Sequence, residues 1–493
     1  MQNMVDQPKE INIVFQKVFK NSLFLLMSAT LGIVIRLAMI PIIARYLGVE
    51  QFGYYSLIMA IALSITPVVE LGLDRIICRE LAKNDLNKDK YFSTAVLLRI
   101  VLSLFWFVLS CLILEWFSPW NRDINVTIIV AIVGQLVISI GLTYVAAIWA
   151  FERMEFDVLA NIAYHFSSIG TLLLVILLGL GLIGILYAKL LSSMVYLIVA
   201  VIFVYRLFLK PLIKFDFNFS KFITIEALPV ALFSIIISLI FKVDVFLLKL
   251  LGTAKDIALF EAPHRLTTQL QILATTINIS IFPLLARSSV IKENSMNMKY
   301  YTETEKYLLI IGMFLTIFLF VGGRSLIVIL FGYEFSEASV SLKILSPVVV
   351  FLFLTTLQSS FLIAIGKQHL NIITTSISLL INIILGILLI PKYHHVGASI
   401  GTFIAYSFLM VIGAYFIAKN GIKFNFILMG KIFFIGIVAS GLVLLNLPDN
   451  FLMLVIKYIL SGSLYITMLF LFKIVSKEDV KKIFKMKFFQ KTV

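Results

Sequence analysis

Long apolar stretches, separated by short polar intervals, follow one another along almost the whole chain. About 20 consecutive apolar residues let an α-helix cross the hydrocarbon core of a bilayer, so we expect each stretch to be a transmembrane helix. The pattern predicts fourteen spans, at residues 23–47, 52–76, 92–117, 126–149, 158–180, 183–205, 227–250, 257–285, 307–330, 340–365, 371–390, 396–417, 427–447 and 451–474. The intervals are too short for a folded extramembrane domain. We therefore predict an all-α polytopic membrane protein.

The composition agrees with this interpretation and excludes a soluble protein. Of the 493 residues, 61% are hydrophobic and 14% are charged. Soluble globular chains have about 45–50% apolar and about 25% charged residues, so this chain has too few charges to cover a water-facing surface. The first apolar stretch ends without the small-residue cleavage site of a signal peptide, and we interpret it as a permanent first span.

The balance of charge predicts how the chain lies in the membrane. It has 41 Lys and Arg against 26 Asp and Glu, a net charge of +15. In a soluble protein this would suggest nucleic acid, but in a membrane protein Lys and Arg collect in cytoplasmic loops. With the N-terminus inside, the fourteen spans place about 28 of these cations on the cytoplasmic side and about seven outside. We therefore expect both termini in the cytoplasm and no nucleic-acid partner.

A weak internal repeat divides the chain into two halves. Tyr46-Leu47-Gly48 ends the first span and Leu250-Leu251-Gly252 ends the seventh, while Ile183-Gly184 and Val396-Gly397 match at a similar offset. Six spans in each copy give both halves the same orientation, as in transporters with parallel repeats. We predict one lobe at residues 1–210 (spans 1–6) and a second at 211–420 (spans 7–12). Residues 421–493 would add spans 13 and 14 and a basic cytoplasmic tail.

Three cations lie deep in their predicted spans. Arg36 is close to the middle of span one, Lys242 is in span seven and Arg265 is in span eight. Ionisable residues inside a membrane are costly and are commonly functional. We expect these three to face a central, water-filled, net positive cavity that receives an anionic head group. The alternative is that they form interhelical salt bridges that only hold the helices together.

Carboxylates occur in the same opening spans of each half. Glu70 and Asp74 are four residues apart in span two, which would stack them on one helical face and make them repel unless a cation or a proton separates them. Asp244 lies in span seven, two residues after a lysine. Glu261 precedes Arg265 by four residues, so both side chains share one face of span eight.

Three further basic residues, Arg99, Lys189 and Lys457, lie within about two helical turns of a predicted span end. Long basic side chains in such positions commonly extend to the membrane surface. We therefore expect all three to snorkel rather than to line a site.

Several short motifs resemble those of a known family. The run Ala44-Arg45-Tyr46-Leu47-Gly48, followed by Phe52-Gly53-Tyr54-Tyr55, resembles the opening of bacterial polysaccharide or O-antigen flippases of the Wzx type. Other similar runs are Glu70-Leu71-Gly72-Leu73, Arg79-Glu80-Leu81-Ala82, Phe282-Pro283-Leu284-Leu285-Ala286-Arg287, Leu330-Phe331-Gly332 and Ala364-Ile365-Gly366-Lys367. The resemblance covers nearly the whole chain, although each motif is short. Phe260 departs from it, because many relatives have tyrosine there.

The resemblance implies the fold of the multidrug/oligosaccharidyl-lipid/polysaccharide exporter superfamily, with two six-helix lobes in a V and two extra C-terminal helices. It also implies transport of an oligosaccharide on undecaprenyl diphosphate across the bacterial inner membrane, by alternating access, for O-antigen, capsule or exopolysaccharide synthesis. The three deep cations would then attract the diphosphate. The carboxylates Asp244, Glu70 and Asp74 would bind a coupling Na⁺ or proton, and no bound cofactor or metal is expected.

Two other classes of membrane protein stay open. A drug or cation antiporter of the same superfamily would share the fold, but that family relies on cavity carboxylates, whereas deep cations are prominent here. An O-antigen polymerase or ligase matches the composition, but such enzymes usually carry a large outer loop, for which this chain has no room. We therefore expect a transporter, not an enzyme. Its partners would be a lipid-linked oligosaccharide, membrane lipids, and the polysaccharide polymerase and chain-length machinery.

Overall fold

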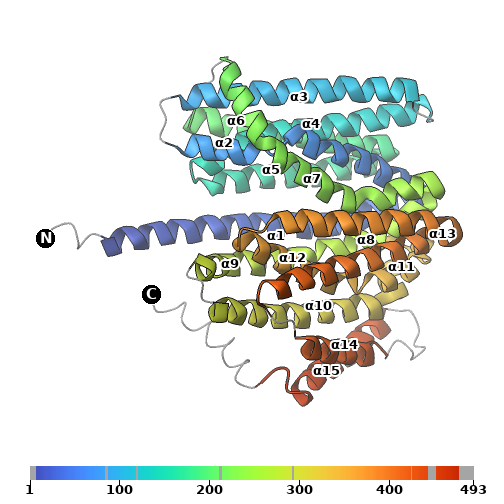
Figure 1. Ribbon diagram of the computed structural model, residues 1–493. Helices are drawn as coiled ribbons and strands as arrows, with labels where there is room; N and C mark the ends of the chain where they lie inside the picture. Colours follow the sequence, from blue (N-terminus) through green and yellow to red (C-terminus); the bar gives the residue numbers. More distant parts are fainter. Residues whose placement is uncertain are drawn as a thin grey trace. The chain divides into compact units, whose positions relative to one another are not determined.

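The computed structural model describes residues 7–83, 87–117, 120–209, 214–290, 294–422, 425–441 and 451–476. Every regular element in these ranges is helical, with no β-strand among them (Figure 1). This confirms the predicted all-α class. Its physical reason is that a helix satisfies its own backbone hydrogen bonds, as a segment in lipid must. The predicted basic tail after residue 476 lies outside the described residues.

The chain divides into two compact units, Met1–Lys249 (unit 1) and Leu250–Val493 (unit 2). The helices that begin in unit 1 are α1 (Gln7–Glu70), α2 (Leu73–Ala82), α3 (Lys88–Phe117), α4 (Arg122–Ala150), α5 (Met154–Leu178), α6 (Gly181–Leu207) and α7 (Phe217–Leu251). Unit 2 has α8 (Ala254–Gln269), α9 (Gln271–Val290), α10 (Asn294–Phe331), the short 3₁₀ helix η2 (Tyr333–Phe335), α11 (Ala338–Leu345), α12 (Val348–Ala364), α13 (His369–Lys419), α14 (Phe426–Ser440) and α15 (Phe451–Leu471). Almost all of α7 therefore belongs to unit 1. The boundary at residue 210 between the two predicted copies of the internal repeat stays a prediction.

Nine helices in the described part of the chain are long and apolar enough to cross a membrane. Two of them, Thr30–Ala82 and His369–Lys419, are 53 and 51 residues long, about twice what one crossing requires. Each contains a backbone kink, at Gly48 (φ 72°) and at His394 (φ 51°), that separates two predicted spans. The count of fourteen spans stays a prediction.

The kink at Gly48 explains part of the Tyr46-Leu47-Gly48 motif. Its backbone, at φ 72° and ψ 175°, lies in a region that residues with a side chain enter only with strain. Beside it, the Tyr46 hydroxyl accepts a hydrogen bond from the Gly181 N–H (2.9 Å) and donates one to the Val175 carbonyl (3.3 Å). The motif therefore ties the end of the first predicted span to the turn between α5 and α6.

In unit 1, α4 packs against α1, α2, α3 and α6, and α5 packs against α1 and α6 (Figure 1). Helices in lipid are held together largely by close packing at small residues. Gly141 of α4 is such a contact, because a Cβ there would lie 2.8 Å from the Tyr196 ring of α6. Because α4 and α6 approach closely here, polar residues of both helices lie inside unit 1.

The start of α7 is fastened to α3. Lys90 pairs with the Asp216 carboxylate at 2.8 Å, and the Tyr91 ring stacks on Phe219 with 4.1 Å between ring centroids. The Phe219 N–H donates to the Asp216 carboxylate at 2.9 Å and so caps the helix. The Lys90 ammonium and this N–H together hold the pKa of Asp216 below its ordinary value.

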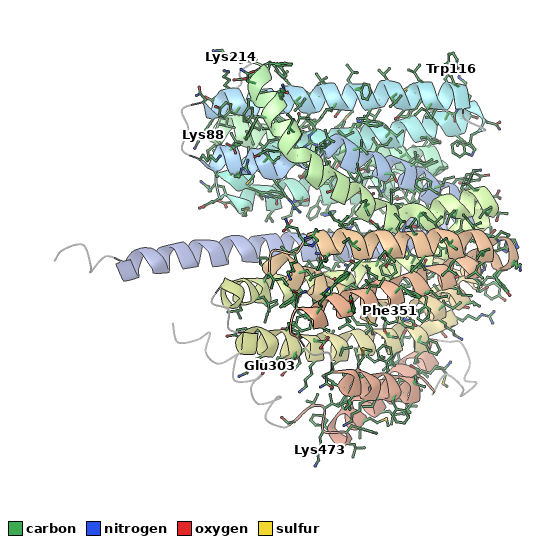
Figure 2. All side chains as sticks on the ribbon, in the orientation of Figure 1. Lys88, Trp116, Lys214, Glu303, Phe351 and Lys473 are labelled. Atoms are coloured by element: carbon green, nitrogen blue, oxygen red, sulfur yellow. The ribbon has the colours of Figure 1, made fainter. Side chains whose placement is uncertain are left out.

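Basic residues gather at one end of unit 1. Figure 2 shows Lys88 and Lys214 at that end and Trp116, near the end of α3, at the other. This segregation is the pattern from which a cytoplasmic orientation of this end is predicted.

In unit 2, α10 packs against α9, α11, α12, α14 and α15. The two C-terminal helices attach to it through specific contacts. Gly436 of α14 lies against Met313, where a Cβ would come within 2.4 Å of the sulfur, and the Tyr465 hydroxyl of α15 donates to the Ile310 carbonyl at 3.0 Å. These helices thus form part of the packed interior of unit 2.

Candidate functional site

The two carboxylates of the second predicted span lie on either side of a helix break. Glu70 ends α1 and Asp74 lies in the first turn of α2, because Leu71 (φ 48°) and Gly72 (φ 69°) turn the backbone left-handed between them. The expectation that they stack on one continuous helical face is therefore wrong. The two carboxyl groups still interact electrostatically.

Arg99 of α3 supplies the cation that Asp74 requires. Its guanidinium is fully buried and its Nη2 pairs with the Asp74 carboxylate. Its remaining hydrogen bonds go to the Thr143 hydroxyl (3.0 Å), the Ser139 hydroxyl (3.2 Å) and the Val69 carbonyl (3.1 Å). The expectation that Arg99 snorkels is wrong, because partners on three neighbouring segments satisfy the guanidinium inside unit 1.

A second group of polar residues surrounds Tyr196 of α6. The Tyr196 side chain is 5% exposed and interacts electrostatically with the carboxylates of Asp157, Asp74 and Glu70. Asp157 is held in place by the Trp149 indole N–H at 3.0 Å and by the Asn161 amide at 2.7 Å. Three carboxylates of unit 1 therefore act electrostatically on one phenol, and Glu70, Asp74 and Asp157 are called the carboxylate cluster below.

Arg36 of α1 lies next to His165 of α5. Both side chains approach Gly32 of α1, where the missing side chain leaves room for them. A Cβ at Gly32 would lie 2.7 Å from His165 Nε2 and 3.6 Å from Arg36 Nη1. Arg36 is exposed, whereas His165 is 5% exposed. Arg36 also interacts electrostatically with Tyr164. The predicted deep cation of span one is thus accompanied by an imidazole and a phenol.

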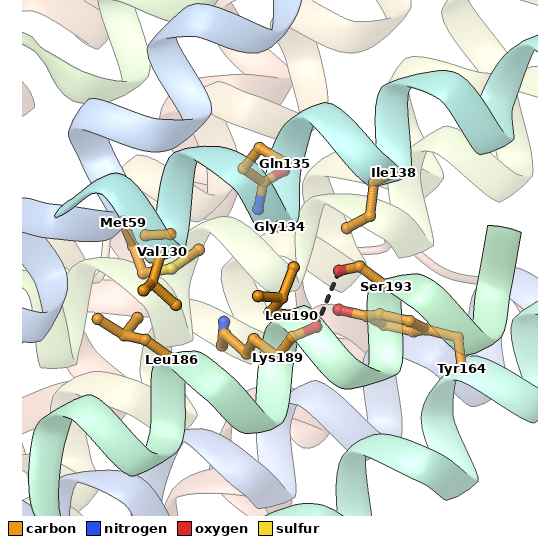
Figure 3. A pocket seen from close by; sticks show the side chains of 11 residues that line it. Met59, Val130, Gly134, Gln135, Ile138, Tyr164, Leu186, Lys189, Leu190 and Ser193 are labelled. Atoms are coloured by element: carbon orange, nitrogen blue, oxygen red, sulfur yellow. Dashed lines mark hydrogen bonds between the residues drawn. The ribbon is translucent and has the colours of Figure 1, made fainter. Parts of the chain in front are cut away.

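A pocket opens between α1, α4, α5 and α6 (Figure 3). It is lined by Met59, Val130, Ala131, Gly134, Gln135, Ile138, Tyr164, Leu186, Lys189, Leu190 and Ser193. The Lys189 ammonium lies 5.2 Å from the centre of the Tyr55 ring. Ser193 donates to the Lys189 carbonyl at 2.8 Å, and Figure 3 shows Tyr164 reaching toward Ser193. The recess therefore offers a cation, an amide and hydroxyls on an apolar wall.

The pocket changes the interpretation of Lys189, which was expected to snorkel. The side chain is half-buried and lines the recess. Tyr164 joins this recess to the Arg36 group, because it interacts with Arg36 and packs edge-on against His165, with 5.2 Å between ring centroids. Two cations of unit 1 are therefore connected through one phenol.

The two ionisable residues predicted in span seven lie on α7. Lys242 is half-buried and Asp244 is 1% exposed. Residues two apart on a helix point about 200° from each other, and their different burial agrees with this.

In unit 2, Arg265 is paired within its own helix. Its Nε donates to the Glu261 carboxylate at 2.5 Å, which confirms the shared face expected from the four-residue spacing. His264 Nδ1 lies 3.8 Å from the other Glu261 oxygen, and its ring stacks on Phe260. Glu261 is completely buried, so α8 carries a compact acid–base group.

The structure brings only some of the predicted site residues together. Glu70 and Asp74 belong to the carboxylate cluster, whereas Arg36 belongs to the group around His165 and Arg265 belongs to α8. The substrate and ion roles of Arg36, Lys242, Arg265, Asp244, Glu70 and Asp74 stay predictions. In the described part of the chain no group of three or more His, Cys, Asp or Glu is arranged to hold a metal ion.

Several members of these groups were missed by the sequence interpretation. His165 is an ionisable residue inside the predicted span 158–180, which is the signal that marks functional positions in membranes, so it could have been found. Asp157 lies one residue before that span, where a carboxylate looks like part of a loop. Tyr164 gives no comparable signal, because a phenol inside a membrane span is common.

Comparison with known proteins decides the family. Residues 18–289, more than half of the chain, match the model of the family described as polysaccharide biosynthesis protein. The chain belongs to the polysaccharide biosynthesis protein family. A probable low-salt glycan biosynthesis flippase, Agl15 of Haloferax volcanii, is 23% identical over 421 residues, which are 83% of this chain and 86% of that protein. An uncharacterized membrane protein of Methanocaldococcus jannaschii is 24% identical over 81% of this chain and 98% of its own.

Solved structures show which fold this family member has. The lipid II flippase MurJ, in an inward closed conformation, matches with a TM-score of 0.73 at 16% identity, over 92% of this chain and 98% of its own. A multidrug resistance transporter of the MATE family matches with a TM-score of 0.66 at 17% identity, over 79% and 95%. The protein therefore has the fold of the multidrug/oligosaccharidyl-lipid/polysaccharide superfamily and is a multi-pass membrane protein.

Proposed function

We propose that this polysaccharide biosynthesis family member is a flippase that moves oligosaccharide units on undecaprenyl diphosphate across the bacterial inner membrane. The units would serve O-antigen, capsule or exopolysaccharide synthesis. The observation that carries the proposal is the family match over residues 18–289 on a chain with the fold of the MurJ flippase. Both termini would lie in the cytoplasm, and a polymerase and its chain-length machinery would use the product.

The deep cations are the residues that suit such a substrate. A diphosphate is anionic, and guanidinium groups bind phosphate through strong, charge-assisted hydrogen bonds. Arg36 is exposed and interacts with Tyr164, which lines the same recess as Lys189 and could serve sugar hydroxyls together with Ser193. Lys242 and Arg265 are the further candidates, and Glu261 would orient Arg265 until the substrate arrives.

Transport would proceed by alternating access and draw on a Na⁺ or proton gradient. The carboxylates predicted to bind the coupling ion are Asp244, Glu70 and Asp74. Asp244 is buried and Glu70 is near the Arg99–Asp74 pair, so both suit a site whose charge changes during the cycle. Asp74 already has Arg99 as its counter-ion, so Asp244 and Glu70 are the better candidates for binding the coupling ion.

The function is tested by complementing a bacterial strain that lacks its polysaccharide flippase. We expect the wild-type protein to restore surface polysaccharide and to clear the glycan held on undecaprenyl diphosphate. Arg36→Ala, Lys242→Ala and Arg265→Ala should each lower export about tenfold or more at equal protein level, since a lost charged hydrogen bond is worth about 1.5–3 kcal/mol. Lys431→Ala, at an exposed position on α14, is the matched control. Undiminished export in all three variants would exclude the cationic site.

The second candidate function is a drug or cation antiporter, which the likeness to the MATE transporter favours. A drug-susceptible strain that expresses the protein provides the comparison. Raised drug resistance without restored polysaccharide export would support the antiporter and overturn the flippase.

A further inference from the structure

A buried carboxyl and a buried phenol lie one turn apart on α10, away from the residues discussed above. Glu305 is 2% exposed and Tyr301 is 1% exposed. Glu305 Oε1 and the Tyr301 hydroxyl have no hydrogen-bond partner among the described residues, although the two groups interact electrostatically. The Tyr301 ring packs edge-on against Phe361 of α12, with 5.4 Å between ring centroids. Both polar atoms are therefore enclosed by packing.

On α10 itself, Lys299 is exposed and Arg324 contacts Tyr333, so neither forms an ion pair with this carboxyl. Glu303, two residues earlier, is exposed and projects away from the helix (Figure 2). The Lys306 ammonium lies 5.6 Å from the centre of the Tyr307 ring. No described Lys, Arg or His nitrogen lies within salt-bridge distance of Glu305.

The helices packed against α10 add few ionisable groups. Helix α12 has none, and the single one on α9 is Arg287, whose side chain lies outside the described residues. On α14, Lys431 is exposed. On α15, Tyr465 donates to the Ile310 carbonyl and Lys457 is 8% exposed.

The remaining packed elements meet α10 near its other end. Lys343 of α11 lies beside Gly323, 18 residues beyond Glu305, and the ionisable groups of η2 are Tyr333 and Glu334. At about 1.5 Å of rise per residue this end is roughly 27 Å away. Among the described ionisable groups of these elements, the Tyr301 phenol is the one that interacts with Glu305.

An ionised carboxylate in such a place would cost several kcal/mol, because the side chain is only 2% exposed and no described cation lies within salt-bridge distance of it. A proton removes that cost. A metal cation would need several oxygen ligands, and this position offers one phenol besides the carboxyl itself.

We propose that Glu305 is a proton-binding site that takes up and releases a proton in the transport cycle, in addition to the carboxylates predicted above to bind the coupling ion. This step rests on the proposed transport function. In the conformation described, the carboxyl holds the proton as O–H. When the cycle opens α10 to water, the proton passes to a water molecule and leaves the carboxylate, which must take up another proton before the packing closes again. The Tyr301 hydroxyl is the adjacent group that can donate to that carboxylate.

Infrared difference spectroscopy tests the proton site without requiring transport. Purified full-length protein in nanodiscs is compared at neutral pH as wild type, Glu305→Gln and Glu303→Gln. We expect a protonated-carboxyl C=O band that Glu305→Gln loses and Glu303→Gln keeps. Its persistence in Glu305→Gln, or its absence from the wild type, would overturn the proposal. Tyr301→Phe should keep the band but shift it, because the neighbouring hydroxyl is gone.

Transport in proteoliposomes tests the coupling. The probe is undecaprenyl diphosphate N-acetylglucosamine, and its translocation is measured with and without an imposed pH difference. We expect the gradient to accelerate wild type and Glu303→Gln, whereas translocation by Glu305→Gln should no longer respond to the gradient. An unchanged response in Glu305→Gln would exclude a coupling role. A wild-type protein that moves no probe yet shows the Glu305 band would refute the proposed function and the coupling role but not the proton site.

Discussion

At the scale of single residues, Arg99 is the most informative side chain. A guanidinium has five N–H donors, and four hydrogen bonds from Arg99 reach a carboxylate, two hydroxyls and a backbone carbonyl. Burying a charge is tolerated only when it is paired and its donors are satisfied. Asp74 and the α4 hydroxyls of Ser139 and Thr143 meet both conditions. Arg99 therefore holds α2, α3 and α4 together.

Arg99→Met should destabilise the protein by about 3 kcal/mol, because it leaves the half-buried Asp74 carboxylate without its cation. Thermal unfolding in detergent measures the loss as a lower Tm. Arg75 is exposed on α2, so Arg75→Ala should change the Tm little. Adding Asp74→Asn to Arg99→Met should recover part of the loss, since two changes in one ion pair are not additive. Equal Tm values for Arg99→Met and Arg75→Ala would contradict the network.

At the scale of helices, the break between α1 and α2 makes this network possible. In a continuous helix the Val69 carbonyl would accept the N–H of residue 73. The left-handed backbone at Leu71 and Gly72 frees this carbonyl, and Arg99 takes it. The Leu71 N–H still donates to the Pro67 carbonyl at 3.1 Å, as in a regular helix, so the break begins after this hydrogen bond. The Glu70-Leu71-Gly72 motif is thus explained by a turn that leaves the Val69 carbonyl available to accept a hydrogen bond from Arg99.

Gly72→Ala should lower stability by about 1–2 kcal/mol, the cost of a left-handed conformation for a residue with a Cβ. Gly72→Asn should cost less, because asparagine tolerates that conformation. Gly170→Ala on α5 is the matched control, since a Cβ there meets nothing within 4 Å. In that helical position alanine should be neutral or stabilising. Thermal unfolding of the three variants provides the comparison, and a Gly72→Ala protein as stable as Gly170→Ala would show that the turn is not strained.

At the scale of the whole molecule, composition and charge asymmetry govern the placement in the membrane. The described helices expose many large apolar side chains, such as Trp116 at 77% and Leu177 at 81%. Such surfaces suit lipid rather than water. The net charge of +15 is then expected to set the orientation, because cations concentrate in the intervals predicted to be cytoplasmic.

Reporter fusions test this orientation on either side of α4. Alkaline phosphatase, which is active only outside the cytoplasm, should be active when fused after Arg122 and inactive when fused after Arg153. A fluorescent protein at the C-terminus should fluoresce, as expected for an even number of spans. Phosphatase activity after Arg153 or at the C-terminus would contradict the predicted topology.

Local patterns predicted the contacts that depend on local geometry. Glu261 and Arg265 pair as their four-residue spacing requires, because the helix between them is continuous. The same spacing failed for Glu70 and Asp74, because two left-handed residues interrupt the helix. Glu305 escaped notice because it lies just before the apolar stretch that begins at residue 307, where a polar residue looks like part of a loop.

The sequence by itself determined the all-helical membrane class and the family resemblance. Both follow from long apolar runs and short motifs, and a chain in lipid has few alternatives to a helix. Only the tertiary structure decided which intramembrane charges are paired between different helices. Arg99 meets Asp74 across 25 residues, and Tyr301 and Glu305 are sealed in by packing around α10. The physical reason is that the protonation and pairing of a buried charge depend on groups that packing brings from distant parts of the chain, and no local pattern records them.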